Sequence, residues 1–465
     1  MLNRLRAPLG ALLVLVAAPV AAQEITPAEH AAIDTAVRSA LDKSGVPSAQ
    51  IAIVRGGKPV LAQAWGTAAP GMPAAPGQPY QIASNSKQFL AALMLLLEND
   101  GKLSLDDHVN KWIRGVTGGE RITIRQLLSH TSGLQDFWPQ DYSFKAMEQP
   151  VSPEAIVSRW AARPLDYEPG TRWQYSNTGY VVAGLIAERA GGKPLWTQFE
   201  ERLFRPLGIH PLKLDDTNGP GFPKGYHRFA LGPVRVAQPA ARGWLWAAGE
   251  LSMTAADLAK WDMARIERKV LPASDWETME TPVRLADGSS GGYGLGVYNR
   301  VVDGRRVIDH GGESVGFLSQ NSTWIDDKAA IVVLTNADFG GVTGELTTKI
   351  AQIVLPRASA TVSGETDRVA DARSALAALA AGRWNPARFT DNAQYYFTPQ
   401  VRGDYRTSLA ALGPLKTITA RPPRLRGGFV NRNYILEYAK RKLVLVTYAE
   451  PGAAGRWEQF IVMPE

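Results

Sequence analysis

The sequence predicts an α/β (α+β) protein in which an antiparallel sheet is flanked by helices and carries an inserted, mainly helical domain. Strand-like segments occur early in the chain, over 49–65, and return much later, over 294–335. Between them, residues 105–270 show mostly helical patterns joined by loops rich in proline and glycine. A length of 465 residues and a 45% hydrophobic composition allow a large core and more than one domain.

Local signals define the first elements. Thr26 followed by Pro27 is typical of a helix start, which predicts a helix over 27–43. The apolar segments 49–54 and 59–65 flank a turn that contains two glycines, and they therefore predict a β-hairpin.

A long apolar run over 88–97 predicts a buried helix that stops at the Asn99-Asp100-Gly101 sequence. Four further helices are expected in the middle of the chain, over 124–129, 153–162, 179–190 and 255–266. Strands are then expected over 294–298, 306–309, 316–324 and 329–335, with a helix near 343–354.

The last quarter of the chain predicts a separate domain. Residues 356–366 are small and polar, the composition of a linker, and a helix is expected over 369–381. Alternating patterns predict three strands, over 435–438, 443–448 and 457–463. We therefore expect a main domain over 23–357, a linker over 358–366 and a small α+β accessory domain over 367–465.

The N-terminus predicts export. Arg4 and Arg6 precede an apolar stretch over 9–18, and small residues follow it, so residues 1–22 are interpreted as a signal peptide. A periplasmic or secreted location is expected. Because this stretch is too short to span a bilayer and no other segment is long enough, no stable membrane span is expected after processing.

Composition excludes several kinds of chemistry. The chain has no cysteine, which rules out disulfides, thiol catalysis and cysteine metal ligands. No pair of its six histidines has metal-ligand spacing, so we expect neither a metal nor a cofactor. The net charge of +7 is concentrated in the last quarter of the chain, but an exported protein seldom meets nucleic acid, and no nucleic-acid partner is expected.

Ser84 and Lys87 form the first candidate catalytic pair. On a helix, residues three apart lie on one face, so the serine hydroxyl and the lysine amine can meet. A helix N-terminus and apolar neighbours both disfavour the ammonium form, and a neutral amine could take the serine proton. The alternative is an ordinary N-cap serine followed by a lysine that extends to solvent.

Two further motifs could complete a site for acyl transfer. Tyr175 and Asn177 precede an apolar helix; a tyrosine near a cation can act as a phenolate base, and the amide can hold a substrate carbonyl. The alternative is a turn whose tyrosine packs in the core. His310, Gly311 and Gly312 follow a predicted strand, where glycine lets substrate approach the backbone. The alternative here is a turn with a surface imidazole.

In this order and on this architecture, the three motifs resemble the S-x-x-K, Y-x-N and K/H-x-G motifs of the serine β-lactamase and penicillin-binding-protein superfamily. The nearest resemblance is to its class C branch, which includes DD-peptidases, D-aminopeptidases and esterases. Segments 124–134, 169–170 and 248–254 agree with it. The resemblance covers roughly residues 28–355 and does not extend to the last hundred residues.

The resemblance implies a role for each residue. Ser84 becomes acylated, Lys87 and Tyr175 share the acid and base work, and Asn177 contacts the substrate amide. The backbone N–H groups of Ser84 and Glu313 form the oxyanion hole.

His310 stands where β-lactamases usually have lysine. In this family, histidine there accompanies peptidases and esterases more than efficient β-lactamases, and a neutral imidazole is a poorer carboxylate anchor than lysine. The predicted function is therefore that of an exported serine hydrolase acting on a small ester or a D-amino-acid-containing peptide, with peptidoglycan as a candidate partner. The alternatives are a β-lactamase proper and a catalytically silent protein that binds peptidoglycan or β-lactams on the same fold.

Ser314 offers a competing nucleophile, because Gly312 to Gly316 match the G-x-S-x-G elbow of α/β-hydrolases. Such an enzyme needs its catalytic histidine after the serine, and none of the six histidines follows Ser314. The sequence therefore favours Ser84. His130 is assigned no chemistry. Five aromatic residues are candidates to line an apolar pocket: Phe137, Trp138, Tyr142, Trp244 and Trp246.

Overall fold

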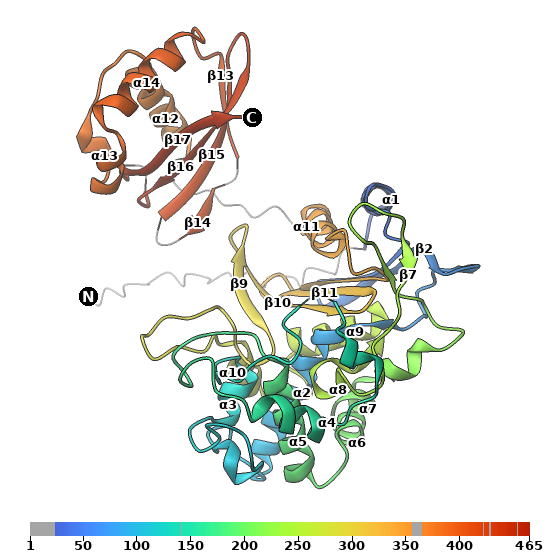
Figure 1. Ribbon diagram of the computed structural model, residues 1–465. Helices are drawn as coiled ribbons and strands as arrows, with labels where there is room; N and C mark the ends of the chain where they lie inside the picture. The colour runs from blue at the N-terminus through green and yellow to red at the C-terminus, as the bar shows by residue number, and fades with distance from the viewer. Residues whose placement is uncertain (1–23, 141, 356–364, 422, 427–428, 453) are drawn as a thin grey trace, which may run out of the picture. The chain divides into compact units, whose positions relative to one another are not determined.

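The computed structural model describes residues 24–140, 142–355, 365–421, 423–426, 429–452 and 454–465 (Figure 1). The predicted signal peptide 1–22 and linker residues 358–364 lie outside these ranges. The last two residues of the predicted linker, 365–366, instead begin helix α12 (Glu365–Ala380). The chain divides into two compact units, one of residues 1–298 with 308–355 and the other of residues 299–307 with 356–465. That these correspond to a hydrolase domain and an accessory domain stays a prediction.

The first unit is built on antiparallel strands in the order β3-β2-β1-β12-β11-β10, and the sheet ends at β9, whose residues 299–302 are assigned to the second unit. Strand β1 pairs with β12, with Ile51 opposite Val333, so strands from the two ends of this unit are neighbours. This confirms the predicted sheet with a helical insertion. The strands are β1 (Ser48–Arg55), β2 (Lys58–Ala69), β3 (Met72–Pro73), β9 (Tyr298–Val302), β10 (Arg305–Ser314), β11 (Phe317–Trp324) and β12 (Ala329–Thr335).

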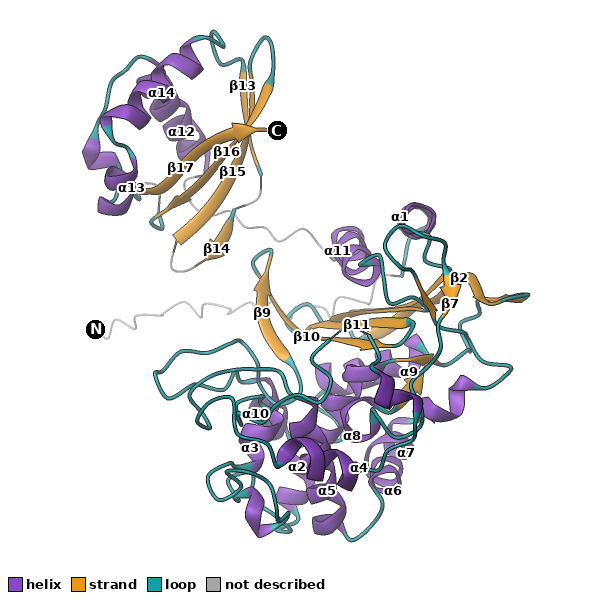
Figure 2. Cartoon of the chain, viewed as in Figure 1, coloured by secondary structure: helices purple, strands orange, loops and turns teal. Residues whose placement is uncertain are grey.

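Helices cover both faces of this sheet (Figure 2). Helices α1 (Pro27–Ser44) and α11 (Val342–Val354) pack together on one face, and α9 (Ala255–Ile266) contacts β1 and β12 on the other. Nearly every residue of β1 and β12 is consequently buried, and most residues of both strands are apolar.

The helical insertion surrounds α2 (Lys87–Asn99), which is buried over most of its circumference and contacts α5 and α8. The helices predicted over 27–43, 88–97, 124–129, 179–190 and 255–266 are confirmed, and 153–162 forms α4 followed by one π-turn. The other helices of the unit are α3 (Ile124–Leu128), α4 (Pro153–Ile156), α5 (Asn177–Gly191), α6 (Leu195–Phe199), α7 (Arg205–Leu207), α8 (Trp246–Gly249) and α10 (Ala273–Glu280). Short strands are β4 (Tyr80–Gln81), β5 (Leu212–Lys213), β6 (Tyr226–His227), β7 (Arg235–Val236) and β8 (Leu251–Met253).

Two strand predictions are wrong in detail. Residues 294–298 do not form a strand, and β9 begins only at Tyr298. Gly296 has a φ of 73°, and a Cβ there would lie 2.8 Å from the carbonyl oxygen of Lys87, so the chain bends to pack against the start of α2. The strand predicted over 306–309 continues to Ser314, which places the His310-Gly311-Gly312 sequence inside β10.

The second unit has its own core and a five-stranded antiparallel sheet with the order β13-β15-β16-β17, in which β14 also pairs with β15. The predicted helix over 369–381 and the three predicted strands are present, whereas α13, α14, β13 and β14 were not predicted. The elements are α12, α13 (Asp391–Tyr396), α14 (Pro399–Ala410), β13 (Thr417–Ala420), β14 (Arg424–Arg426), β15 (Phe429–Glu437), β16 (Lys442–Ala449) and β17 (Trp457–Pro464). In the described parts of both units, no helix has the length and apolarity needed to cross a membrane.

Candidate active site

Ser84 lies in a 3-10 turn, Ala83–Ser86, that leads directly into α2. The predicted contact is present although the first turn is not α-helical: Lys87 Nζ lies 3.0 Å from Ser84 Oγ. Ala83 has a φ of 46°, a left-handed conformation that costs a non-glycine residue about 1–3 kcal/mol. The turn is therefore strained immediately before the candidate nucleophile.

Lys87 is completely buried beneath Ser84. Its Nζ also lies 2.8 Å from Asn177 Oδ1 and 2.7 Å from the carbonyl oxygen of Ala248. Burial lowers the pKa of Lys87 to about 7, although the nearby Asp136 carboxylate favours the charged form. A neutral amine has two N–H donors for these two oxygens, which leaves its lone pair for the Ser84 hydroxyl proton.

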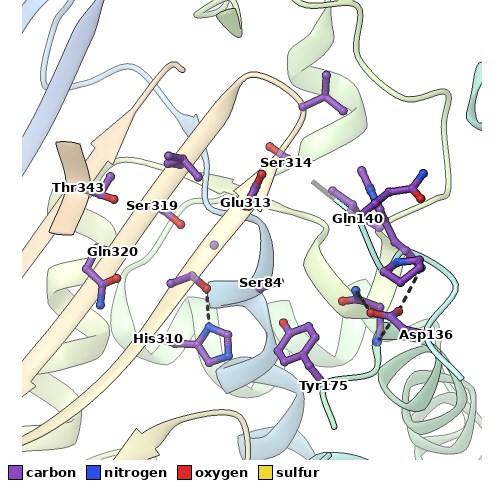
Figure 3. A pocket seen from close by; sticks show the side chains of 18 of the residues that line it. Ser84, Asp136, Gln140, Tyr175, His310, Glu313, Ser314, Ser319, Gln320 and Thr343 are labelled. Atoms are coloured by element: carbon purple, nitrogen blue, oxygen red, sulfur yellow. Dashed lines mark hydrogen bonds between the residues drawn. The ribbon is translucent and has the colours of Figure 1, made fainter. Parts of the chain in front are cut away.

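Tyr175 lies beside Ser84 (Figure 3). Lys87 Nζ is 4.9 Å from the centre of the Tyr175 ring. Burial raises the pKa of Tyr175 well above its usual range, and a hydrogen bond with Ser84 opposes this only in part. The geometry therefore favours a neutral phenol over the predicted phenolate. The His130 ring packs 4.1 Å from the Tyr175 ring, between centroids, and fixes its plane.

Asn177 begins α5, and its side chain is held on both sides. Its Oδ1 accepts from Lys87, while its backbone N and its Nδ2 donate to Asp136 at 3.0 and 3.2 Å. Asp136 thereby fixes the orientation of the amide. The sequence did not identify Asp136, because no local pattern links it to a partner that follows 41 residues later.

The strand β10 supplies the opposite side of the site. His310 is only 3% exposed; its Nε2 lies 2.9 Å from Tyr293 Oη, and its Nδ1 contacts the carbonyl oxygen of Gly311. The surface-imidazole alternative is therefore wrong. Both ring nitrogens already have partners within the protein, so His310 is poorly placed to bind a substrate carboxylate. Tyr293 was not identified from the sequence.

A cavity of about 700 Å³ joins the two sides. Its only charged lining groups among the described residues are Asp136 and Glu313, and it contains no lysine or arginine. Of the five aromatic candidates, Trp138 lines it; Phe137 and Trp244 lie in the core, Trp246 packs on the core, and Tyr142 is exposed. The lining residues are Ser84, Asp136, Trp138, Pro139, Gln140, Gln174, Tyr175, Asn177, Leu245, Tyr298, His310, Gly311, Gly312, Glu313, Ser314, Val315, Leu318, Ser319, Gln320 and Thr343.

Ser314 also lines this cavity but in a different setting. It is buried at the end of β10, and its Oγ donates to Gln81 Oε1 at 2.8 Å. The chain then turns at Gly316 into β11, so the segment is strand–turn–strand rather than the strand–turn–helix of a nucleophile elbow.

Comparison with known proteins places this geometry in a family. A family model described as Beta-lactamase matches residues 33–355. The chain belongs to this beta-lactamase family. The match includes every candidate site residue and leaves out the last 110 residues of the 465.

Members of the family with known names resemble the chain at modest identity. A D-aminopeptidase of Brucella anthropi is 26% identical over 344 residues, 72% of this chain and 64% of its own. A penicillin-binding protein of Bacillus subtilis (strain 168) is 27% identical over 277 residues, 56% of this chain and 61% of its own. The chain thus spans less than two thirds of the length of either relative.

The solved structure of a D-stereospecific amidohydrolase from Streptomyces sp. aligns with a TM-score of 0.61 and 28% identity. The alignment covers 68% of this chain and 97% of that one. Its likeness supports the fold class predicted from the sequence, a mixed α/β protein with antiparallel sheets flanked by helices.

Proposed function

We propose that the chain is a serine hydrolase that forms an acyl-enzyme on Ser84 and acts on D-amino-acid amides, D-amino-acid-containing peptides or esters. The observation that carries this proposal is the buried Lys87 amine, 3.0 Å from a half-buried Ser84 hydroxyl that opens into a large cavity. The resemblance to a D-aminopeptidase and a D-stereospecific amidohydrolase supports amides and peptides as substrates.

In the first step, Ser84 Oγ attacks the substrate carbonyl carbon, and its proton passes to the neutral Lys87 amine. The carbonyl oxygen becomes an oxyanion between the N–H groups of Ser84 and Glu313. The Tyr175 phenol then gives its proton to the leaving amine or alkoxide and regains one from Lys87. Water attacks the ester in a second cycle, Lys87 takes the water proton, and Ser84 is released with its own proton restored.

The charge of the cavity selects among substrates. A β-lactam or a D-alanyl-D-alanine peptide carries a carboxylate near the reacting bond, and the carboxylates of Asp136 and Glu313 repel such a group. His310, with both nitrogens engaged, offers little compensation. The lining therefore supports neutral or ammonium-bearing amides and esters over antibiotics, which argues against a β-lactamase proper. Export through residues 1–22 and contact with peptidoglycan remain part of the proposal.

A labelling experiment tests the nucleophile. The wild type should react with a fluorophosphonate probe, Ser84→Ala should lose the label, and Ser314→Ala should keep it. Retention of label in Ser84→Ala with loss in Ser314→Ala would overturn the assignment, and failure of the wild type to react would favour a silent binding protein.

Turnover of a substrate panel then tests the substrate class. D-aminoacyl nitroanilides and nitrophenyl esters should be hydrolysed much faster than nitrocefin. Faster turnover of nitrocefin would identify a β-lactamase.

A further inference from the structure

The Ser319 hydroxyl connects two parts of the cavity. One is the nucleophile turn, Ala83–Ser86, and the other is the strand wall, formed by β10 and β11. Its Oγ donates to the carbonyl oxygen of Ile82 at 2.8 Å and accepts from Asn85 Nδ2, also at 2.8 Å. Ile82 and Asn85 lie on either side of the strained Ala83-Ser84 pair. Ser319 and Asn85 are both almost completely buried, so these bonds are shielded from water.

Gly312 leaves the space that this contact occupies. It lies directly opposite Ser319 in the pairing of β10 with β11. A Cβ at Gly312 would come within 2.0 Å of the Ile82 carbonyl oxygen and 2.4 Å of Ser319 Oγ. The second glycine after His310 is therefore required by the packing of β10 on the nucleophile turn, in addition to any substrate that approaches the backbone.

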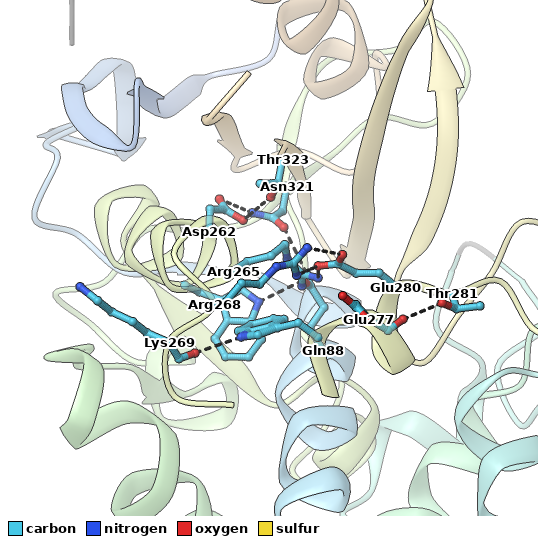
Figure 4. A network of polar contacts seen from close by, with 12 residues as sticks. Gln88, Asp262, Arg265, Arg268, Lys269, Glu277, Glu280, Thr281, Asn321 and Thr323 are labelled. Carbon is cyan, nitrogen blue, oxygen red and sulfur yellow. Dashed lines mark hydrogen bonds and ion pairs between the residues drawn. The ribbon is translucent and has the colours of Figure 1, made fainter. Parts of the chain in front are cut away.

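Asn85 is oriented from its other side by Gln88, which belongs to a buried network with Arg265 and Glu280 (Figure 4). Gln88 Nε2 donates to Asn85 Oδ1 at 3.1 Å, and Gln88 Oε1 accepts from Arg265 at 2.6 Å and from Trp261 at 3.1 Å. Arg265 in turn pairs with Glu280, and both are almost completely buried. Because both ends of the Asn85 amide are engaged, its rotation would break the bonds to Ser319 and Gln88.

We propose that Ser319 and Asn85 are positioning residues that hold the two N–H donors of the oxyanion hole at a fixed separation. The inference rests on the proposed acyl-enzyme function. One donor, Ser84 N–H, lies between Ile82 and Asn85, and the other, Glu313 N–H, follows Gly312. The Ser319 hydroxyl bonds to the turn that carries the Ser84 N–H and packs against Gly312, next to the Glu313 N–H. It therefore sets the distance between the two N–H donors. An oxyanion hole is effective only when both donors lie about 3 Å from the developing charge.

This role differs from a purely structural one in what it predicts. A bond that only stabilises the fold would change the melting temperature and leave the bound enzyme's chemistry intact. A bond that sets donor positions should weaken binding of a tetrahedral anion more than binding of the substrate. A phenylboronate that adds to Ser84 provides such an anion, since its boron becomes tetrahedral and negatively charged.

Ser319→Ala and Ser319→Cys test the proposal, with Ser48→Ala as the matched control. Ser48 is also a buried strand serine with two hydrogen bonds, to Tyr80 at 2.7 Å and Asn336 at 2.6 Å, but it does not line the cavity. In Ser319→Ala we expect kcat for a nitrophenyl ester to fall about 10- to 100-fold, less than complete loss of one donor, with KM within about threefold. The Ki of phenylboronate should rise by a similar factor.

Ser319→Cys leaves no cavity and keeps a weak donor, so it protects the test if the alanine variant folds poorly. In Ser319→Cys, kcat should fall and the Ki of phenylboronate should rise, each by about tenfold. Ser48→Ala should leave kcat and Ki within about twofold of the wild type. Equal kcat and Ki in Ser319→Cys and wild type, with fluorophosphonate still labelling Ser84, would overturn the positioning role and leave the proposed hydrolase intact. Loss of labelling at Ser84 in the wild type would instead overturn the hydrolase itself.

Discussion

The two walls of the cavity differ in what they contribute. On the helical wall, the Lys87 amine links two side chains, since its Nζ lies 3.0 Å from Ser84 Oγ and 2.8 Å from Asn177 Oδ1. On the strand wall, β10 presents two glycines, the engaged His310 imidazole and the exposed Glu313 side chain. Under the proposed function, we expect the helical wall to carry out the bond-making chemistry and the strand wall to orient the substrate.

The backbone explains this difference. Side chains three residues apart on a helical turn meet, so the helical wall brings functional groups into contact. A strand instead offers its main chain: β10 has ten residues against the five of β9, so it extends beyond that neighbour. A substrate can lie along such a strand as an added strand does. Substitutions on the helical wall should therefore change kcat, and those on the strand wall should change selectivity.

Lys87→Met should have the largest effect. Removal of the base is expected to lower kcat/KM for a nitrophenyl ester by about 10²- to 10⁴-fold. The melting temperature should change little, because the removed cost of burying the amine offsets the donor that Asn177 Oδ1 and the Ala248 carbonyl lose. Steady-state kinetics measures kcat/KM, and thermal unfolding measures the melting temperature.

Lys260→Met is the control for this substitution. Like Lys87, Lys260 donates to a main-chain carbonyl, that of Gly208; it donates in addition to the Asp257 carboxylate and lies outside the cavity. It should keep wild-type kcat/KM. A Lys87→Met variant that kept full activity would show that Lys87 is not the base and would contradict the role proposed for the helical wall.

The pH profile should separate the two proton-carrying groups on the helical wall. Because the pKa of Lys87 is lowered to about 7, the neutral amine increases as pH rises through that value, and kcat/KM should rise about tenfold per pH unit below it. The pKa of Tyr175 is raised, so no falling limb is expected in the neutral range.

The same lysine makes the free energy of unfolding depend on pH. Its folded pKa lies below its unfolded value of 10.5, so between about pH 7 and 10.5 the unfolded chain binds more protons and the stability contributed by this site rises with pH. Lys87→Met should lack both the rising rate limb and this contribution. A wild-type profile that is flat from pH 5 to 8, with chemistry rate-limiting, would contradict a lysine base.

Sequence reasoning identified the residues whose signals are local. Ser84 and Lys87 are three residues apart, and the motifs around Tyr175 and His310 are contiguous. It missed Asp136 and Ser319, because the first bonds to a residue 41 positions away and the second to one 237 positions away. Such contacts exist only once the sheet and the helical insertion pack together. The strand predicted over 294–298 failed for the same reason, since Gly296 packs against the start of α2.

The smallest expected effect concerns selectivity on the strand wall. The wild type should hydrolyse a D-aminoacyl nitrophenyl ester with a free ammonium faster than its N-acetyl form. Glu313→Gln removes one of the two carboxylates in the lining, so this preference should shrink about three- to fivefold, the size expected for one charge near solvent.

Salt provides an independent check, because 0.5 M NaCl should reduce the wild-type preference in the same direction. Glu154→Gln, on the exposed start of α4 and outside the cavity, is the matched control and should change nothing. If the ammonium preference is equally strong in Glu313→Gln, Asp136 on the helical wall is the group that selects charge. The strand wall would then not determine substrate specificity.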